Sequence, residues 1–384
     1  MISAARLAWL QLRRQKIRLA VAIAGVAFAV ILMFMQFGFR DALFRSAVNV
    51  HERLRADIVL IHPHYTIVAL PISIARSRLH QARAFAGVAS VTAVYSGLGR
   101  WKNPVTGAER NAFVIGVDPT ADVLDIPEVN AQREAIRHPN VVLYDELSRP
   151  EFGPVAATLH AGREIVTEVS KHQVAVKGLF RLGASFGIDA TVVTSDLNFL
   201  RMFPFHDPGA ISAGLVRLSP GADPDRVRDA LAAALPRDVE VLTKRQYEER
   251  EVAYWASATP IGYVFTFGVV MGLVVGSIIV YQILFTDISD HLAEYATLKA
   301  MGYANRFLAG VVLIEALILA VAGFLPGLAL CHSLYGLTES ATMLPMRLSA
   351  ARSALVLGLT VVMCWGSGVI AMRKLRAADP AEVF

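Results

Sequence analysis

Four long runs almost free of charged residues constrain this chain more than any other feature. They span residues 19–39, 252–286, 307–331 and 353–372, and only Glu315 in the third run carries a charge. A helix needs about 20 apolar residues to cross a hydrocarbon core. The chain is 55% hydrophobic, with a mean hydropathy of +0.48, which is too apolar for an ordinary soluble protein. We therefore predict four transmembrane helices, at 19–39, 259–286, 306–331 and 352–373.

Basic residues near the ends of these runs predict the orientation of the chain. Cytoplasmic flanks are enriched in Lys and Arg, and here those flanks contain Arg6, Arg13, Arg14, Lys16 and Arg18 before the first run and Arg373, Lys374 and Arg376 after the last. We expect both termini to be cytoplasmic in a bacterial inner membrane, with 1–18 as an amphipathic N-terminus and 374–384 as a tail. The first run is longer than the core of a signal peptide, and no cleavage site follows it closely, so we interpret it as a retained anchor. The net charge of +5 then requires no nucleic-acid partner.

With this topology, residues 40–258 form a large α+β periplasmic domain between the first and second spans, and 332–351 form a short periplasmic loop. Helical stalks are predicted at 40–55 and from Thr243 into the second span, where Thr243 and Gln246 form a capping box. A helix is predicted at 73–86. Further strand patterns lie at 57–62, 91–102, 110–117, 141–144, 164–169, 173–180, 191–194, 214–218 and 239–242, and Asp223-Pro224 opens a helix between the last two. Both cysteines, Cys331 and Cys364, fall in membrane runs, so the domain must be stabilised by its own core.

The cytoplasmic segment 287–305 carries a second amphipathic pattern. In a helix over 287–302, one apolar face would hold Ile288, Leu292, Tyr295 and Leu298, and the opposite face would hold Asp287, Asp290, His291, Glu294 and Thr297. Gly302 is a typical terminator. Asp290 and Glu294 are like charges four residues apart, which slightly destabilises a helix, so we expect a cationic partner surface. The alternative is a short solvated loop helix.

Four segments resemble one family. They are Glu294–Gly302 (EYATLKAMG), 12–18 (LRRQKIR), 313–317 (LIEAL) followed by Gly323 and Gly327, and 378–382 (ADPAE). In this order they resemble the FtsX/MacB-like ABC transporter permeases. The external segments 56–61 (ADIVLI), 101–104 (WKNP) and 116–119 (GVDP) resemble the DevC branch, the permeases of heterocyst-glycolipid exporters.

The resemblance implies a role for 287–305 as a coupling helix that docks on a separate ABC ATPase through Asp290, Glu294, Tyr295, Leu298, Lys299 and Gly302. It further implies a homodimer, a periplasmic adaptor (a membrane fusion protein), a TolC-like outer-membrane channel and a lipid or other hydrophobic cargo. Two alternatives remain in the same family: an FtsX-like mechanical signalling subunit that controls a cell-wall hydrolase, and a lipoprotein-releasing permease.

The sequence holds no ATP-binding motif of its own. No Lys is followed by Ser or Thr, so a P-loop cannot occur. We therefore expect this chain to be no enzyme, with no catalytic residues, and ATP and Mg²⁺ to be bound by the partner. His62 and His64 are too few for a metal site, so no metal or other cofactor is predicted.

Two features within the spans remain. Glu315 should be paired, protonated or lining a polar cavity, and intramembrane carboxylates are functional candidates; a structural pair near the inner interface is the alternative. Gly268, Gly272 and Gly276 form a smooth ridge on the second span. Such a ridge permits close helix packing, either at a dimer seam or within the bundle.

Overall fold

The computed structural model describes residues 6, 8–10 and 16–377, with only the backbone for 373–377. The chain divides into two compact units, one made of 1–42 with 260–384 and the other of 43–259. The terminal segments that carry Arg13, Arg14 and the ADPAE tail lie outside the described residues, as do the side chains of Arg373, Lys374 and Arg376.

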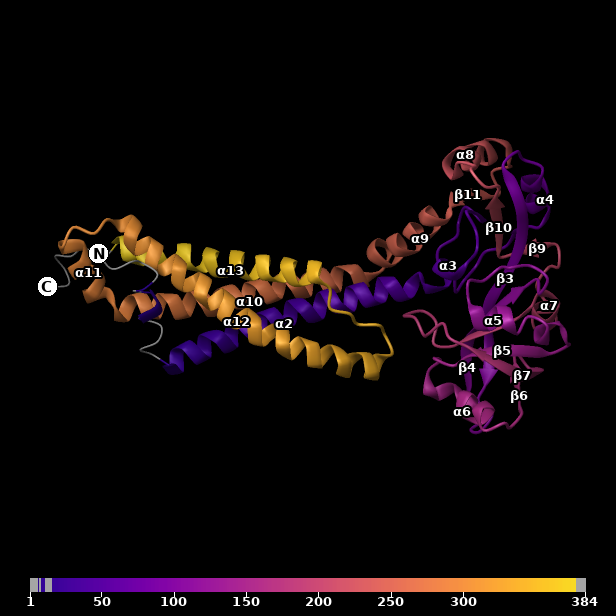
Figure 1. Ribbon diagram of the computed structural model, residues 1–384, viewed down its shortest axis with the longest axis horizontal. Helices are drawn as coiled ribbons and strands as arrows, with labels where there is room; N and C mark the ends of the chain where they lie inside the picture. The colour runs from indigo at the N-terminus through magenta and orange to yellow at the C-terminus, as the bar shows by residue number, and fades with distance from the viewer. Residues whose placement is uncertain (1–5, 7, 11–15, 378–384) are drawn as a thin grey trace. The chain divides into compact units, whose positions relative to one another are not determined.

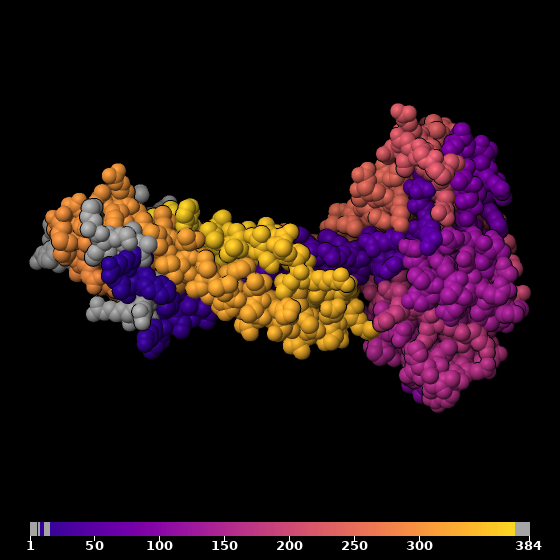
Figure 2. Space-filling model, in the orientation of Figure 1, coloured from indigo at the N-terminus to yellow at the C-terminus, as the bar shows by residue number. Residues whose placement is uncertain are grey.

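The first unit is helical. Its long helices are α2 (Lys16–Ala47, whose last turn belongs to the second unit), α10 (Pro260–Asp290), α12 (Asn305–Thr342) and α13 (Ala350–Ala377), and α11 (Leu292–Ala300) connects α10 to α12. Among the described residues, these four long helices are the ones apolar enough to cross a membrane. They lie side by side (Figure 1), and α12 and α13 cover one face of the unit together (Figure 2).

Two helix boundaries differ from the sequence-based expectation. The predicted loop 332–351 is helical up to Thr342, and the chain leaves that helix at Met343 with a positive φ of 59°. The predicted continuous helix from Thr243 into the second span is interrupted. A π-helical turn at Tyr254–Ala258 ends at Thr259 in an extended conformation. Pro260 then begins α10. A proline disfavours the helical conformation in the residue before it, which accounts for the extended Thr259.

The second unit is an α+β domain. Its elements are α3 (Asn49–Arg53), β1 (Ile58–Ile61), β2 (Ile74–Ala75), α4 (Ser77–Arg83), β3 (Val88–Lys102), β4 (Glu109–Val117), α5 (Pro127–Ala131), β5 (Val141–Asp145), α6 (Val155–His160), β6 (Ile165–Val169), β7 (His172–Phe180), β8 (Thr191–Ser195), α7 (Asp196–Met202), β9 (Ala210–Ile211), β10 (Ala213–Leu218), α8 (Pro224–Ala234), β11 (Glu240–Thr243) and α9 (Lys244–Ala253), with short 3₁₀ turns at Ala135–Arg137 and Pro150–Phe152. The predicted helix 73–86 is wrong at its start, where β2 pairs with β9 instead.

In the described residues, nine strands form one mixed sheet in the order β11-β1-β10-β3-β4-β8-β5-β7-β6. The long strand β3 joins its two halves: residues before Val94 pair with β10, and residues from Val94 onward pair with β4. The last strand, β6, also pairs with β3 through a single residue pair, Trp101 with Val169. The second half of the sheet is therefore closed. In the first half, β1 lies between β10 and β11 and is antiparallel to both, so these two strands are parallel to each other, connected by α8.

The core of this unit lies on both faces of the sheet. Strand β1 is entirely apolar and entirely buried, with Ile58 and Leu60 in one cluster and Val59 and Ile61 in the other. Alternate residues of a strand point to opposite faces, so a short run of four apolar residues contributes to both clusters. The sheet is therefore a rigid support for the segments that enter and leave it.

Candidate functional site

The predicted coupling segment is two helices rather than one. Helix α10 ends at Asp290, His291 has a non-helical ψ of 12°, and α11 begins at Leu292. The main-chain bonds His291 N to Asp287 O (3.1 Å) and Tyr295 N to His291 O (3.0 Å) persist across this break. The chain therefore bends at His291 without losing its hydrogen bonds.

The two faces of this segment agree only partly with the periodic pattern. On the apolar side, Ile288 and Tyr295 are fully buried. On the predicted acidic side, Asp290, Glu294 and Thr297 are exposed, but Asp287 and His291 are buried. The assignment of these two residues to the outer face is wrong, because the bend at His291 changes the phase between the two helices.

Internal partners explain most of this polar surface. His291 Nδ1 lies 3.5 Å from Asp287 Oδ1. Asp290 forms an ion pair with Arg18 of α2. The like-charge pair of Asp290 and Glu294 therefore does not require an outside cation, contrary to the sequence argument. Glu294 is exposed and forms no ion pair with any described residue, so it is the acidic group of this segment that remains available to a partner.

Gly302 ends α11 as the sequence predicts. Its φ of +92° is in the left-handed region. The Tyr303 N–H donates to Leu298 O (3.1 Å) and the Gly302 N–H donates to Lys299 O (2.9 Å). This is the Schellman arrangement, in which a residue without a Cβ turns the chain and satisfies the last carbonyls of a helix. The segment between α10 and α12 is thus a short, firmly terminated helix.

Glu315 is buried within the helical unit. Its exposed fraction is 0%, and neither of its carboxyl oxygens has a hydrogen-bond partner in the part of the chain that is described. The pairing that sequence alone left open is therefore absent from the described contacts.

The glycine ridge of α10 packs within the chain. A methyl group placed at Gly272 would lie 3.5 Å from Leu32 of α2, at Gly268 it would meet Gln36, and at Gly276 it would meet Ala29 and Met363. The ridge is thus occupied by α2, with α13 at one end. This geometry favours the bundle alternative over the dimer seam.

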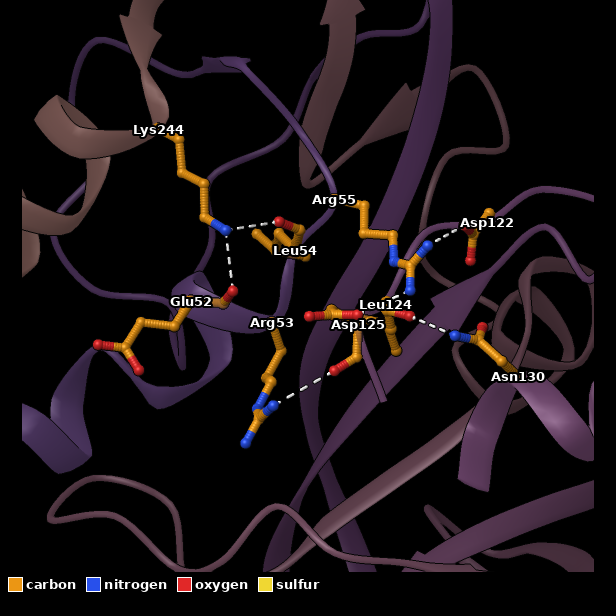
Figure 3. A network of polar contacts seen from close by, with 9 residues as sticks. All are labelled: Glu52, Arg53, Leu54, Arg55, Asp122, Leu124, Asp125, Asn130 and Lys244. Carbon is orange, nitrogen blue, oxygen red and sulfur yellow. Dashed lines mark hydrogen bonds and ion pairs between the residues drawn. The ribbon is translucent and has the colours of Figure 1, made fainter. Parts of the chain in front are cut away.

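A polar network ties together the segment that enters the sheet unit and the helix that leaves it (Figure 3). Lys244, the first residue of α9, donates through Nζ to Glu52 O (2.8 Å) and Leu54 O (2.9 Å). Arg55 binds Asp122 and also Asp125 at 2.7 Å. We call this network and the buried cluster of the next paragraph the stalk junction.

The buried part of the stalk junction centres on Glu251 of α9, which is 2% exposed. Its carboxylate accepts hydrogen bonds from Tyr65 Oη (2.9 Å), the Val68 N–H (3.0 Å) and Trp255 Nε1 (3.1 Å). His51 of α3 places Nε2 at 3.4 Å from Glu251 and 3.2 Å from Tyr65 Oη. Burial, reinforced by nearby Tyr247 and Glu251, raises the pKa of Tyr65 well above its usual value. The cluster therefore holds α3, the chain after β1 and α9 together in the dry interior.

Sequence reasoning missed the stalk junction, because a lone His51 in a helical pattern and a Glu in a charged helix carry no distinctive signal. It also missed a buried arginine. Arg352 of α13 is 7% exposed, binds Asp41 of α2, and lies 3.3 Å from Tyr335 Oη of α12. This arginine, at the start of the fourth predicted span, therefore connects α13 to α2 and α12.

Two exposed loops of the sheet unit border cavities. Phe205 is fully exposed beside a cavity of about 610 Å³ lined also by Phe199, Phe203 and Leu70. Val105, 72% exposed, borders a second cavity of about 400 Å³. Near the start of the sheet unit, His62 and His64 form no metal cluster with other described residues, and His62 Nδ1 accepts the His64 N–H instead (3.1 Å).

Comparison with known families decides what kind of protein carries these features. The family model of the MacB-like periplasmic core domain matches residues 19–234, more than half of the chain, and that of the FtsX-like permease C-terminal domain matches 266–380. The chain belongs to the FtsX/MacB-like family of ABC permeases. The resemblance noted in the sequence is thereby confirmed for the family, whereas neither model distinguishes a DevC branch. Permeases of this family are membrane subunits that work with an ABC ATPase partner.

Two solved structures are similar to part of this chain. The periplasmic region of MacB from Actinobacillus actinomycetemcomitans is 12% identical, with a TM-score of 0.35, covering 53% of this chain and 96% of the other. The extracellular domain of the noncanonic ABC-type transporter YknZ from Gram-positive bacteria is 12% identical, with a TM-score of 0.34, covering 48% and 99%. No curated protein matches the sequence. The family assignment therefore rests on the two sequence models.

Proposed function

We propose that this permease couples ATP hydrolysis by a separate ABC subunit to motion of its sheet unit, and so drives export of a lipid or other hydrophobic cargo. The observation that carries this proposal is the stalk junction. The chain passes between the two units twice, around residues 42–43 and 259–260. Within the sheet unit, the two adjoining segments are bound to each other by Lys244 and Glu251. A displacement of either segment would therefore move the whole sheet unit as one body.

The proposed topology places both termini and the turn between α10 and α12 in the cytoplasm, and the sheet unit in the periplasm. It is tested by single cysteines at Ser90 in β3 and Thr297 in α11, both exposed positions, in a background lacking Cys331 and Cys364. An impermeant maleimide applied from outside should label Ser90→Cys and spare Thr297→Cys until the membrane is opened. Labelling of both from outside would refute the topology.

The ATPase is proposed to dock on α11. Glu294 is the exposed acidic group there without an ion pair among the described residues, so Glu294→Lys should uncouple ATP hydrolysis while the chain still inserts. Close charge pairs at protein interfaces are worth about 1.5 kcal/mol or more, so binding should weaken about tenfold or more. Glu339→Lys, the same reversal near the far end of α12, is the matched control and should leave ATPase stimulation unchanged. Normal stimulation of ATPase by Glu294→Lys would remove this residue from the interface.

The adaptor is proposed to bind the loops that carry Val105 and Phe205, with a TolC-like channel beyond it. Exposed apolar side chains on loops of a rigid scaffold are common protein-binding sites, and both residues lie at cavity rims. Photo-crosslinkers at these two positions should capture an adaptor in cells, whereas a crosslinker at exposed Arg226 on α8 should not. Capture of a peptidoglycan hydrolase instead would favour the mechanical signalling role.

A further inference from the structure

Glu315 of α12 is a feature of the helical unit that the proposed coupling and export do not use. Its side chain is fully buried, and both oxygens lack hydrogen-bond partners among the described residues. On the same face of α12, Val311, Val312 and Leu319 are fully buried, so the neighbouring surface is apolar. A carboxylate in such a site has neither water nor a donor to stabilise its charge, and a buried acid without partners becomes neutral instead.

A second carboxyl group acts on Glu315. Asp287 of α10 interacts electrostatically with Glu315, and its Oδ2 is likewise buried without a hydrogen-bond partner in the described part of the chain. The other oxygen faces His291, and the charges of Arg18, Asp290 and Glu294 also act on Asp287. Burial raises the pKa of Asp287, with His291 and Arg18 acting in the opposite direction, whereas the charge that acts on Glu315 is the negative one of Asp287.

We propose that Glu315 is a proton-binding site inside the helical unit, and that Asp287, at the end of α10 beside the coupling segment, is the positioning residue that holds the proton there. A negative charge nearby disfavours ionisation of a second carboxyl group. The ligand is a single proton rather than a metal ion, because the described residues contain no cluster of three metal-ligating side chains. The proton remains bound while Asp287 keeps its place, and a shift of the α10–α11 bend that separates the two carboxyl groups weakens its binding.

The inference does not depend on which cargo is moved, and it is tested on the full chain in lipid nanodiscs. Infrared spectra of protein labelled with ¹³C at glutamate carboxyl groups report the protonated carboxyl stretch separately from the carboxylate stretch. We expect a protonated glutamate band at neutral pH that vanishes in Glu315→Gln and persists in Glu339→Gln. Because the label itself reports on the unaltered chain, the first observation holds even where a variant fails to fold.

The role of Asp287 is tested by titration of the same band. Asp287→Asn removes the neighbouring negative charge, so the band should disappear at a pH lower by on the order of one unit than in the unaltered chain. Ser289→Ala, on the same turn of α10, should leave the titration unchanged. Absence of a protonated glutamate band at neutral pH would overturn the proton site, and an unchanged titration in Asp287→Asn would overturn the role given to Asp287.

Discussion

Truncation of Glu251 tests whether the stalk junction holds the sheet unit together. Glu251→Ala removes an acceptor shared by three donors: the buried Val68 N–H and the half-buried Trp255 Nε1 lose their partner, whereas Tyr65 Oη keeps His51 Nε2 at 3.2 Å. An orphaned buried donor costs about 1–3 kcal/mol, and two donors are orphaned here. We therefore expect a loss of about 4 kcal/mol. For a unit of this size, 1 kcal/mol corresponds to about 2–4 °C in Tm, which gives a decrease of about 8–16 °C.

The assay is thermal unfolding of the full chain in detergent, followed by tryptophan fluorescence, since Trp101 and Trp255 both lie in the sheet unit. Glu251→Gln should lose about half as much stability. Its amide oxygen still accepts hydrogen bonds, but its amide NH2 group faces a donor. Glu249→Ala, an exposed position on the same helix, is the control and should change stability by no more than about 0.5 kcal/mol. A Tm for Glu251→Ala within about 2 °C of the unaltered chain would refute the reasoning.

Three further predictions concern packing, charge and pH. Gly323→Ala should destabilise the helical unit by about 1–3 kcal/mol, since the added methyl would lie 3.2 Å from Ile23 O. Gly272→Ala should be tolerated, because its methyl would lie 3.5 Å from Leu32 Cβ. Equal melting temperatures of the two variants would contradict this. Lys244→Met should lower the free energy of urea unfolding by about 1.5–3 kcal/mol, because two carbonyls lose a charged donor. Arg245→Met, at an exposed position, should cost little. Equal losses in the two variants would show that these two hydrogen bonds do not stabilise the unit. Burial raises the pKa of Tyr144 to about 12, so the unfolded chain ionises first and stability falls from about pH 10 to about 12. Tyr144→Phe should lose about 2–3 kcal/mol less stability over that interval. An unchanged pH profile in this variant would show that Tyr144 does not cause the loss.

Elements that depend on local chemistry could be predicted from the sequence. Charge-free length is sufficient to predict the long helices, because a membrane span requires only enough consecutive apolar residues. The capping box of Thr243 with Gln246 and the left-handed Gly302 formed as expected, since their partners lie within a few residues along the chain. The pattern also placed Tyr295 on the buried side of the coupling segment and Glu294 on the exposed side.

Which polar groups are buried, and what they contact, depends on tertiary packing. Asp287 and His291 follow the same periodicity as Glu294, yet they are buried, because a bend at one residue changes the phase of the helix. Glu251 meets Tyr65 across 186 positions of sequence, and Arg18 meets Asp290 across 272. Helical periodicity relates residues three or four positions apart, so it contains no information about such distant partners. Folding brings them together because desolvated charges and donors must find partners wherever the packed chain provides them.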